Sequence, residues 1–388
     1  MRMKDSFLGY RRPDGTVGCR NHVLVLAAMD SANPTVRRIA AMVPTVEAVT
    51  IPYGRGQYGQ DGDQTRRVLV GLASNPNVAA CVVVSLEPVS ANQIAEAIEK
   101  TGKPVVAIAI QEAGDTLRAA HEGAVAAAGF VRQMSRQRRE PAPLSDLTLG
   151  VECGGSDTTS GIASNPALGW VADRVVEAGG NVVLSETSEI LGAEHVLAKR
   201  AVNKEVGEDI VRIVDAIETE ARRRGVDIRG ANPVPDNIKG GITTIEEKSL
   251  GAILKAGTMP VQGVLKYGDR AAGSSGLYVM DTPAPAVESL TGLVSGGCQI
   301  IGFTTGVGNS IGAKISPIVK ITGNPNTVER MGIAMDADVS AVTLGVQTLA
   351  DAGDRLGASI LDFLDGSLTA AEVLGEEEIA ISRLESTI

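Results

Sequence analysis

Residues 78–110 read VAACVVVSLEPVSANQIAEAIEKTGKPVVAIAI, and this stretch decides the fold class. The unbroken apolar run 78–86 is typical of a strand that is covered on both faces, as strands of parallel sheets are. A helical pattern follows, with Ser90 as the expected N-cap and Gly102 as the stop. A second apolar strand is expected over 104–110. This strand–helix–strand order predicts parallel strands joined by a right-handed crossover.

The same alternation extends in both directions along the chain. HVLVLAA (22–28) and TVEAVTIPY (45–53) read as earlier strands, and LTLGVEC (147–153) opens a further strand–helix series. We therefore predict an α/β protein with two or more doubly wound, mainly parallel-sheet units.

The polar segment 135–146 carries two prolines and is the expected linker between two units. It divides the chain into an N-terminal α/β domain, 1–140, and a C-terminal catalytic α/β domain, 141–388. A possible sub-boundary lies near 230–240, where ANPVPDNIKGG interrupts the pattern.

The composition narrows the choice of partners. The 388 residues carry a net charge of −10, which disfavours nucleic acid or an anionic membrane as the main partner and leaves a small anionic substrate possible. Four scattered Cys without a C-x-x-C pair fit a reducing compartment. The N-terminus lacks the apolar core of a signal peptide, and no apolar run approaches the roughly 18 to 20 residues that span a bilayer. We expect a cytoplasmic protein.

The turn CGGSDTTSG (153–161) directly follows a predicted strand. Carboxyl ends of parallel strands are where α/β enzymes place their active sites. Cys153 is a candidate metal ligand, and Ser156 and Thr158 are candidate donors to an anionic substrate. The alternative is an ordinary polar loop.

The segment ETSEILGAEH (186–195) combines carboxylates with one of only three His. Carboxylate and imidazole together suit acid/base catalysis or a divalent ion such as Fe²⁺ or Mn²⁺. Glu189, Glu194 and His195 are the candidate catalytic residues, and Glu189 and His195 are candidate metal ligands with Cys153. The alternative is a solvated acidic helix start.

Further candidates for binding an anionic substrate lie on turns. Arg forms a planar fork that suits carboxylate, phosphate or sulfonate oxygens, and a Lys beside a Gly pair at a helix start can clamp an anion. For each turn the alternative is a plain surface loop. The candidates are Arg20 and Asn21; Arg55 and Gln57; Lys239, Thr243 and Thr244; and Asn309.

Taken in order, these motifs resemble the altronate/galactarate dehydratase family. The matching pieces run nearly the full length of the chain: GYRRPDGTVGCRNH (9–22), SNPNVAA (74–80), CGGSDTTSGIASNPALG (153–169), ETSEILGAEH (186–195), NIKGGITTIEEKSLG (237–251), FTTGVGN (303–309) and KITGNP (320–325).

Two departures from the family pattern refine the resemblance. The chain starts at the large catalytic part, without the small N-terminal SAF-type domain of the sugar-acid dehydratases. It also has Tyr53-Gly54-Arg55 where they tend to have His-Gly-Cys. Both features are similar to the sulfolactate sulfo-lyase branch, in which the small domain is a separate chain. An Arg at this place could pair with a sulfonate.

The resemblance implies a lyase that removes a proton α to a carboxylate and expels a β-substituent. The leading expectation is conversion of (2R)-3-sulfolactate to pyruvate and sulfite, and the alternative is a hydro-lyase of a sugar acid such as altronate or galactarate. A divalent metal, Fe²⁺ or else Mn²⁺, would stabilise the dianionic intermediate. The expected partners are a separate SAF-domain subunit and further copies in an oligomer. A non-catalytic scaffold subunit is the third reading.

Overall fold

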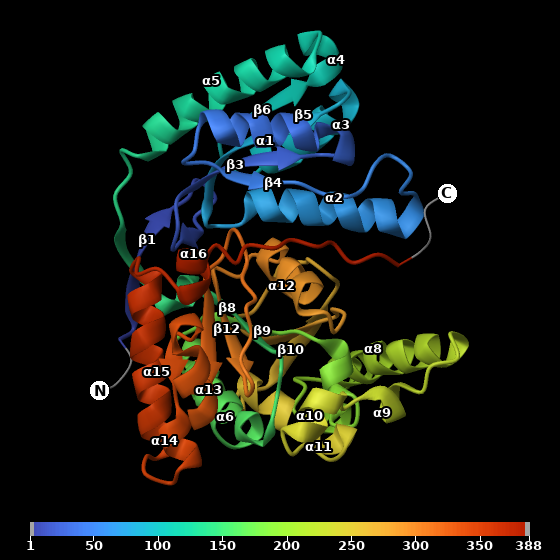
Figure 1. The fold of residues 1–388 in the computed structure, drawn as a ribbon, viewed down its shortest axis with the longest axis vertical. Helices are drawn as coiled ribbons and strands as arrows, with labels where there is room; N and C mark the ends of the chain where they lie inside the picture. Colours follow the sequence, from blue (N-terminus) through green and yellow to red (C-terminus); the bar gives the residue numbers. More distant parts are fainter. Residues whose placement is uncertain (1–3, 385–388) are drawn as a thin grey trace.

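The computed structural model describes residues 4–384, which form two stacked α/β units (Figure 1). The N-terminal unit has a four-stranded parallel sheet in the order β4 (Glu47–Val49), β3 (His22–Ala27), β5 (Val78–Ser85), β6 (Val105–Ala109). The C-terminal unit has a seven-stranded parallel sheet in the order β10 (Val261–Leu265), β11 (Gly276–Met280), β9 (Asn181–Leu184), β8 (Thr148–Cys153), β12 (Ile300–Thr305), β13 (Ile318–Thr322), β14 (Ala337–Asp338). The prediction of doubly wound, mainly parallel-sheet units is confirmed.

Helices cover both faces of the N-terminal sheet (Figure 1). One side carries η1 (Asp30–Ala32), α1 (Asn33–Met42), α4 (Ile110–Ala113) and α5 (Thr116–Met134), and the other carries α2 (Gly59–Ser74) and α3 (Pro88–Glu99). The strands between them are apolar throughout, and β5 is buried at all eight positions. Burial on both faces explains why this strand reads as an unbroken apolar run.

The helices of the C-terminal unit pack around the larger sheet. The regular ones are α6 (Asn165–Glu177), α7 (Glu194–Lys199), α8 (Lys204–Arg223), α9 (Ile228–Ala231), α10 (Pro235–Lys239), α11 (Ile245–Ala252), α12 (Ala286–Ser295), α13 (Pro325–Met331), α14 (Ser340–Thr343), α15 (Leu349–Leu364) and α16 (Ala370–Leu374). The short turns are η2 (Leu144–Asp146), the π-helical η3 (Ser160–Ser164), η4 (Thr187–Ile190), η5 (Ile253–Ala256) and η6 (Gly332–Ala334).

The expected linker 135–146 is not plain connecting chain. Its residues Glu140–Pro143 form β7, which pairs antiparallel with β1 (Ser6–Arg11), and β1 pairs in turn with β2 (Val17–Gly18). The proline-containing strand lies at the edge of this small sheet, where a missing N–H is tolerated. The boundary predicted at residue 140 therefore falls inside a strand that ties the two ends of the N-terminal unit together.

One local prediction was wrong. Glu87, not Ser90, caps α3, because its carboxylate accepts the backbone N–H groups of Val89 and Ser90. The segment 186–195 contains two short elements, since η4 ends at Ile190 and α7 begins at Glu194.

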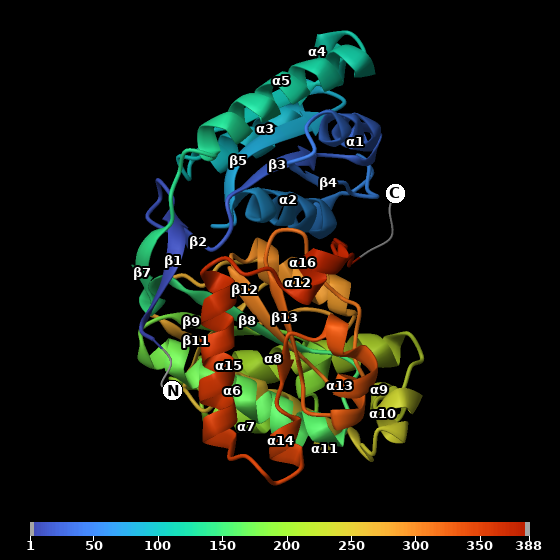
Figure 2. The ribbon, with the colours of Figure 1, turned by 60° about the vertical axis from the view of Figure 1, so that its left-hand side comes forward.

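The two units share an apolar interface, and Figure 2 shows α2 lying over α12. At Gly71 a Cβ atom would lie 2.4 Å from the carbonyl oxygen of Ser295, so only glycine allows this approach. Asn75 and Asn77 donate side-chain hydrogen bonds to carbonyls of the C-terminal unit at Val294 (2.7 Å) and Gln299 (2.8 Å). None of the helices within residues 4–384 is long and apolar enough to cross a membrane.

Candidate functional site at the switch point of the larger sheet

The larger sheet has a topological switch point between β8 and β12. The chain leaves β8 for β9 on one side and leaves β12 for β13 on the other, and α/β folds place their ligand-binding crevice at the carboxyl ends of two such strands. The loops after the two strands are tied together, because the N–H groups of Gly306 and Val307 both donate to the carbonyl of Gly155 at 3.0 Å. The turn 153–161 is therefore at the position expected for an α/β active site.

A fully enclosed ionic cluster lies beneath this crevice. The Nζ atom of Lys255, on η5, is 3.1 Å from the Sγ atom of Cys153 and 3.3 Å from the Oε2 atom of Glu186. The same Glu186 oxygen accepts the backbone N–H of Cys153 at 2.9 Å. All three residues are at most 3% exposed. Burying charge is unfavourable unless it is paired, and here each charge has a partner.

Glu186 is also the one non-glycine residue with a positive φ, at 67°, among the described residues. A left-handed conformation is strained for a glutamate and persists only where the surroundings enforce it. It turns the carboxylate back toward the end of β8. Such strain concentrates at functional sites, so it marks this cluster as more than packing.

Burial governs the protonation of the cluster. It raises the pKa of the Cys153 thiol to about 12, and Glu186 raises it further while Lys255 opposes the shift. Burial also raises the pKa of Glu186, against the effect of Lys255. Burial alone would lower the pKa of Lys255, but Cys153 and Glu186 hold it above its usual value. Lys255 is therefore the fixed cation of the cluster.

A second pair lies beside the first and is less enclosed. The Nζ atom of Lys248 donates to Oε1 of Glu189 at 3.0 Å and to Oδ1 of Asn232 at 2.8 Å. The side chains of Lys248 and Glu189 are 10% and 8% exposed, against 0% for Lys255. Glu189 also acts electrostatically on Cys153 and Glu186. Of the three predicted catalytic residues, Glu189 is thus the one that the structure brings to the cluster.

The other two predicted catalytic residues do not join it. Glu194 accepts the backbone N–H of Gly192 at 2.5 Å, and His195 is exposed on α7. Within residues 4–384 no three His, Cys, Asp or Glu side chains are arranged to hold a metal ion. Cys153 instead faces the ammonium of Lys255, which repels a cation. The structure does not bring the three predicted ligands, Cys153, Glu189 and His195, into an arrangement that fits a divalent ion. The metal remains an expectation from the family resemblance.

The hydroxyl-rich loop 153–161 is largely occupied by the chain itself. Oδ1 of Asp157 accepts the Thr159 hydroxyl (2.6 Å) and the Ser160 N–H (3.1 Å), so a carboxylate already sits at this helix start. Thr158 donates its hydroxyl to the Gly240 carbonyl at 3.3 Å. Ser156 is buried, and its backbone carbonyl accepts a hydrogen bond from the Asn237 side chain.

The predicted anion clamp at 239–244 is likewise filled by a carboxylate of the chain. Thr244 caps α11 by accepting the N–H of Glu247, and Glu247 accepts both the N–H (2.8 Å) and the hydroxyl (2.5 Å) of Thr243. Lys239 is exposed at the end of α10. Asn309 lies beside the turn 153–161. Its amide nitrogen is close enough to Gly154 that a Cβ atom added there would lie 3.2 Å away.

Arg20 and Asn21 have structural partners. All five N–H groups of Arg20 are used: two donate to the Glu372 carboxylate, at 2.6 and 2.8 Å, and three to backbone carbonyls. Asn21 accepts from Arg12 at 2.7 Å and donates to the Met134 carbonyl at 3.0 Å. No donor of Arg20 is left for a substrate.

Arg55 and Gln57 lie at the carboxyl edge of the other sheet. Arg55 is exposed, makes no hydrogen bond within the described chain, and lowers the pKa of Glu87 as a minor effect after the hydrogen bonds of Ser90. The Gln57 Nε2 atom is buried without a hydrogen-bond partner. These are free groups, as a ligand site requires, but no contact joins them to the Cys153 cluster.

Sequence reasoning missed three residues of the cluster. Glu152, in a strand that is otherwise apolar or small, was the available signal, since a carboxylate there must be buried. It is 0% exposed, and burial together with Glu186 raises its pKa well above the usual value. Lys248 lies within the family motif 237–251 but was given no role, and Lys255 lies among ordinary helix residues outside every motif.

Comparison with known proteins agrees with the resemblance drawn from the motifs. Residues 144–387 match the model of the D-galactarate/altronate dehydratase C-terminal domain, and residues 9–135 match that of the D-galactarate dehydratase/altronate hydrolase second domain. The chain belongs to the D-galactarate/altronate dehydratase family.

Family members differ in how much of their length the chain spans. It is 40% identical to the (2R)-sulfolactate sulfo-lyase subunit beta of Chromohalobacter salexigens, over 98% of this chain and 97% of that protein. It is 33% identical to the altronate dehydratase of Bacillus subtilis and 32% identical to that of Escherichia coli, over 84% and 96% of this chain but only 67% and 76% of those enzymes. Sulfo-lyases and dehydratases both act by elimination, which supports lyase activity in this chain.

Proposed function

We propose that the chain is the large subunit of a lyase that eliminates sulfite from 3-sulfolactate. The observation that carries the proposal is the match in both identity and length to the sulfo-lyase subunit. The altronate dehydratases match less closely and extend well beyond the chain. The second candidate is a hydro-lyase acting on a sugar acid, and it is supported by the dehydratase family models and by the altronate dehydratases at lower identity.

The reaction is a β-elimination. A base removes the C2 proton, which is α to the carboxylate. The electron pair of that C–H bond forms the C2=C3 bond, and the C3–S bond breaks so that sulfite leaves with its electrons. The resulting enol tautomerises to pyruvate. The difficult step is the first, because the intermediate carries two negative charges that need electrostatic stabilisation.

We assign proton removal to the Glu189–Lys248 pair. Glu189 supplies a carboxylate near the crevice, and Lys248 supplies a positive charge at 3.0 Å that can stabilise the developing anion. The enclosed Lys255–Glu186 pair would act as a positioning unit that fixes the end of β8. Arg55 would bind the sulfonate through charge-assisted hydrogen bonds. We propose that assembly of the enzyme brings Arg55 to the site.

We further propose assembly with a small SAF-type subunit. The relative's name, a subunit beta, supports a partner subunit, and the SAF type is our expectation from the family resemblance. The test is to measure sulfite and pyruvate released from 3-sulfolactate by the chain alone and with such a subunit, with altronate as the competing substrate. We expect stoichiometric sulfite and pyruvate from the pair and weak activity from the folded chain alone. Turnover of altronate without sulfite would refute the sulfo-lyase assignment, and full turnover by the chain alone would refute the two-subunit arrangement.

A further inference from the structure

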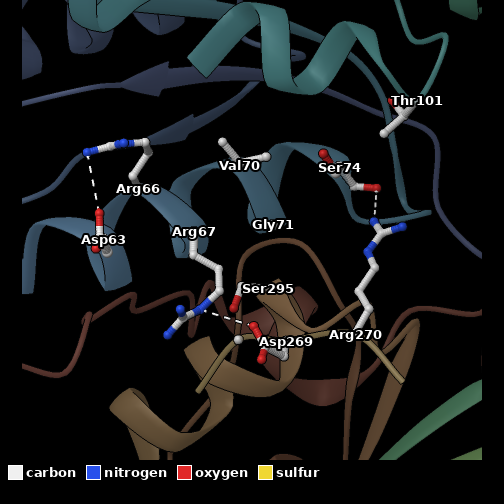
Figure 3. Close-up of a pocket in the computed structure, with 11 residues that line it drawn as sticks. Asp63, Arg66, Arg67, Val70, Gly71, Ser74, Thr101, Asp269, Arg270 and Ser295 are labelled. Carbon is white, nitrogen blue, oxygen red and sulfur yellow. Dashed lines mark hydrogen bonds and ion pairs between the residues drawn. The ribbon is translucent and has the colours of Figure 1, made fainter. Parts of the chain in front are cut away.

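A cavity of about 510 Å³ lies between the two units, away from the Cys153 cluster. Helix α2 of the N-terminal unit forms one wall, and the turn 268–270 with the end of α12 forms the other (Figure 3). The cavity shares no residue with the switch-point site, and none of its lining residues was among the candidate site residues predicted from the sequence. It is large enough for a small metabolite.

Arg67 enters the cavity from α2. Its Nε atom donates to the carbonyl of Tyr267 at 3.0 Å and is paired with Asp269 at 3.2 Å. These contacts anchor the side chain across the interface between the units. The terminal nitrogens of Arg67 have no hydrogen-bond partner in the described chain, so both of them can donate hydrogen bonds to a ligand.

Arg270 enters from the opposite wall. One Nη2 hydrogen bond to the carbonyl of Ser74 holds it, and its other nitrogens have no partner among residues 4–384. Burial lowers the pKa of Arg270, and Asp14 is the one group that opposes this shift. Burying a charged guanidinium is unfavourable, and a hydrogen bond to a neutral carbonyl offsets only part of that free-energy cost. A bound anion would offset more of it.

A buried lysine shares the Ser74 carbonyl with Arg270. Lys103 is 3% exposed and donates to the carbonyls of Ser74 (2.7 Å) and Asn75 (2.5 Å). Burial lowers its pKa well below the usual value, and Arg12 and Arg270 lower it further. The end of the cavity near Ser74 is therefore short of negative charge.

Figure 3 shows Gly71 and Ser295 between the two arginines, with Arg67 on one side and Arg270 on the other. Gly71 and Ser295 pack directly against each other there, so the two arginines flank a close contact between α2 and α12. We propose that this cavity binds a small organic acid with two anionic groups, one held by Arg67 and the other by Arg270. Such a ligand would bridge α2 to the turn 268–270 and so stabilise the arrangement of the two units.

The test is binding of succinate, which carries one carboxylate at each end. Isothermal titration calorimetry of the full chain with succinate, against sodium chloride at equal ionic strength, should show saturable binding. Arg270→Gln removes one charged partner and should weaken the association constant about 10- to 100-fold, the equivalent of one charge-assisted hydrogen bond or slightly more. Arg212→Gln is the matched control, because Arg212 is exposed on α8, away from the cavity, and pairs with Asp209.

A second variant keeps the test independent of folding. Arg67→Lys preserves the charge opposite Asp269 but lacks the free terminal nitrogens, so it should also weaken succinate binding while circular dichroism stays unchanged. If succinate does not saturate the wild type, or binds both variants as tightly as the wild type, the proposal is wrong. The measurement needs no turnover, so its outcome does not depend on whether sulfite is released.

Discussion

The ammonium of Lys255 lies 3.1 Å from the thiol sulfur of Cys153, with both side chains closed off from solvent. A lysine ammonium therefore lies next to the cysteine that the sequence suggested as a metal ligand. Glu186 and Glu189 also act electrostatically on Lys255. The balance of this cluster can be tested by removing one charge at a time.

Lys255→Met should lower the free energy of unfolding by about 3–5 kcal/mol, because it leaves Glu186 buried without its cation. Urea denaturation followed by circular dichroism measures the change. Lys204→Met is the control, since the exposed Lys204–Glu208 pair should contribute less than about 0.5 kcal/mol. Adding Glu186→Gln to Lys255→Met should restore part of the loss. If Lys255→Met and Lys204→Met both change the free energy of unfolding by the same small amount, the Lys255–Glu186 pair does not stabilise the fold.

His22 should make the protein sensitive to mild acid. Burial, together with the charge of Arg20, lowers its pKa to about 4. The unfolded chain takes up this proton near pH 6.5 whereas the folded chain does not. Stability is therefore full above pH 6.5 and falls by about 1.4 kcal/mol per pH unit between 6.5 and 4.

Denaturation midpoints at several pH values would check this contribution. His22→Gln should flatten the slope of stability against pH by about one proton, while His195→Gln, at an exposed site, should leave it unchanged. The assignment is contradicted if the slope of His22→Gln matches that of the wild type.

Arg20→Lys should destabilise the fold rather than weaken substrate binding. One ammonium cannot replace five N–H donors, and Glu372 loses its two-point contact, so we expect a loss of about 3 kcal/mol or more. Arg11→Lys is the control, because Arg11 forms an exposed pair with Glu140. A large rise in KM without any loss of stability would instead return Arg20 to the substrate site.

Much of the fold was predictable because parallel strands buried on both faces leave a continuous apolar signature. The run 78–86 and strand β5 (Val78–Ser85) agree almost residue for residue. Helix α2 was not foreseen, since its first turns carry Gly59, Gly62 and several polar residues, and it is held by packing on α12 rather than by its own pattern.

The site was less predictable for a different reason. The sequence identifies residues that can bind an anion, but it does not show whether a carboxylate of the chain itself already occupies them. Thr243 and Arg20 looked like ligands for an external anion, and each is occupied by a carboxylate of the chain, Glu247 and Glu372. The position of the turn 153–161 at a strand end was correctly expected, because strand order places such loops at the same edge of the sheet.

The last prediction concerns Arg55, which separates the two enzymatic readings. It is exposed and makes no hydrogen bond within residues 4–384, so its whole guanidinium can bind a ligand. If it binds the sulfonate, Arg55→Ala should lower kcat/KM for 3-sulfolactate about 10- to 100-fold, because charge-assisted hydrogen bonds contribute roughly 1.5 to 3 kcal/mol each. Arg55→Lys should recover little of this.

Sulfite release by the assembled enzyme is the measurement, with Arg118→Ala as the control, since Arg118 is exposed in the same unit and pairs with Asp115. In a hydro-lyase the departing group is a hydroxyl that needs a proton, not a guanidinium, so Arg55 would have a modest effect on altronate turnover. An Arg55→Ala enzyme that releases sulfite at the wild-type rate would remove Arg55 from the sulfonate site, because the variant has no charge left with which to bind a sulfonate.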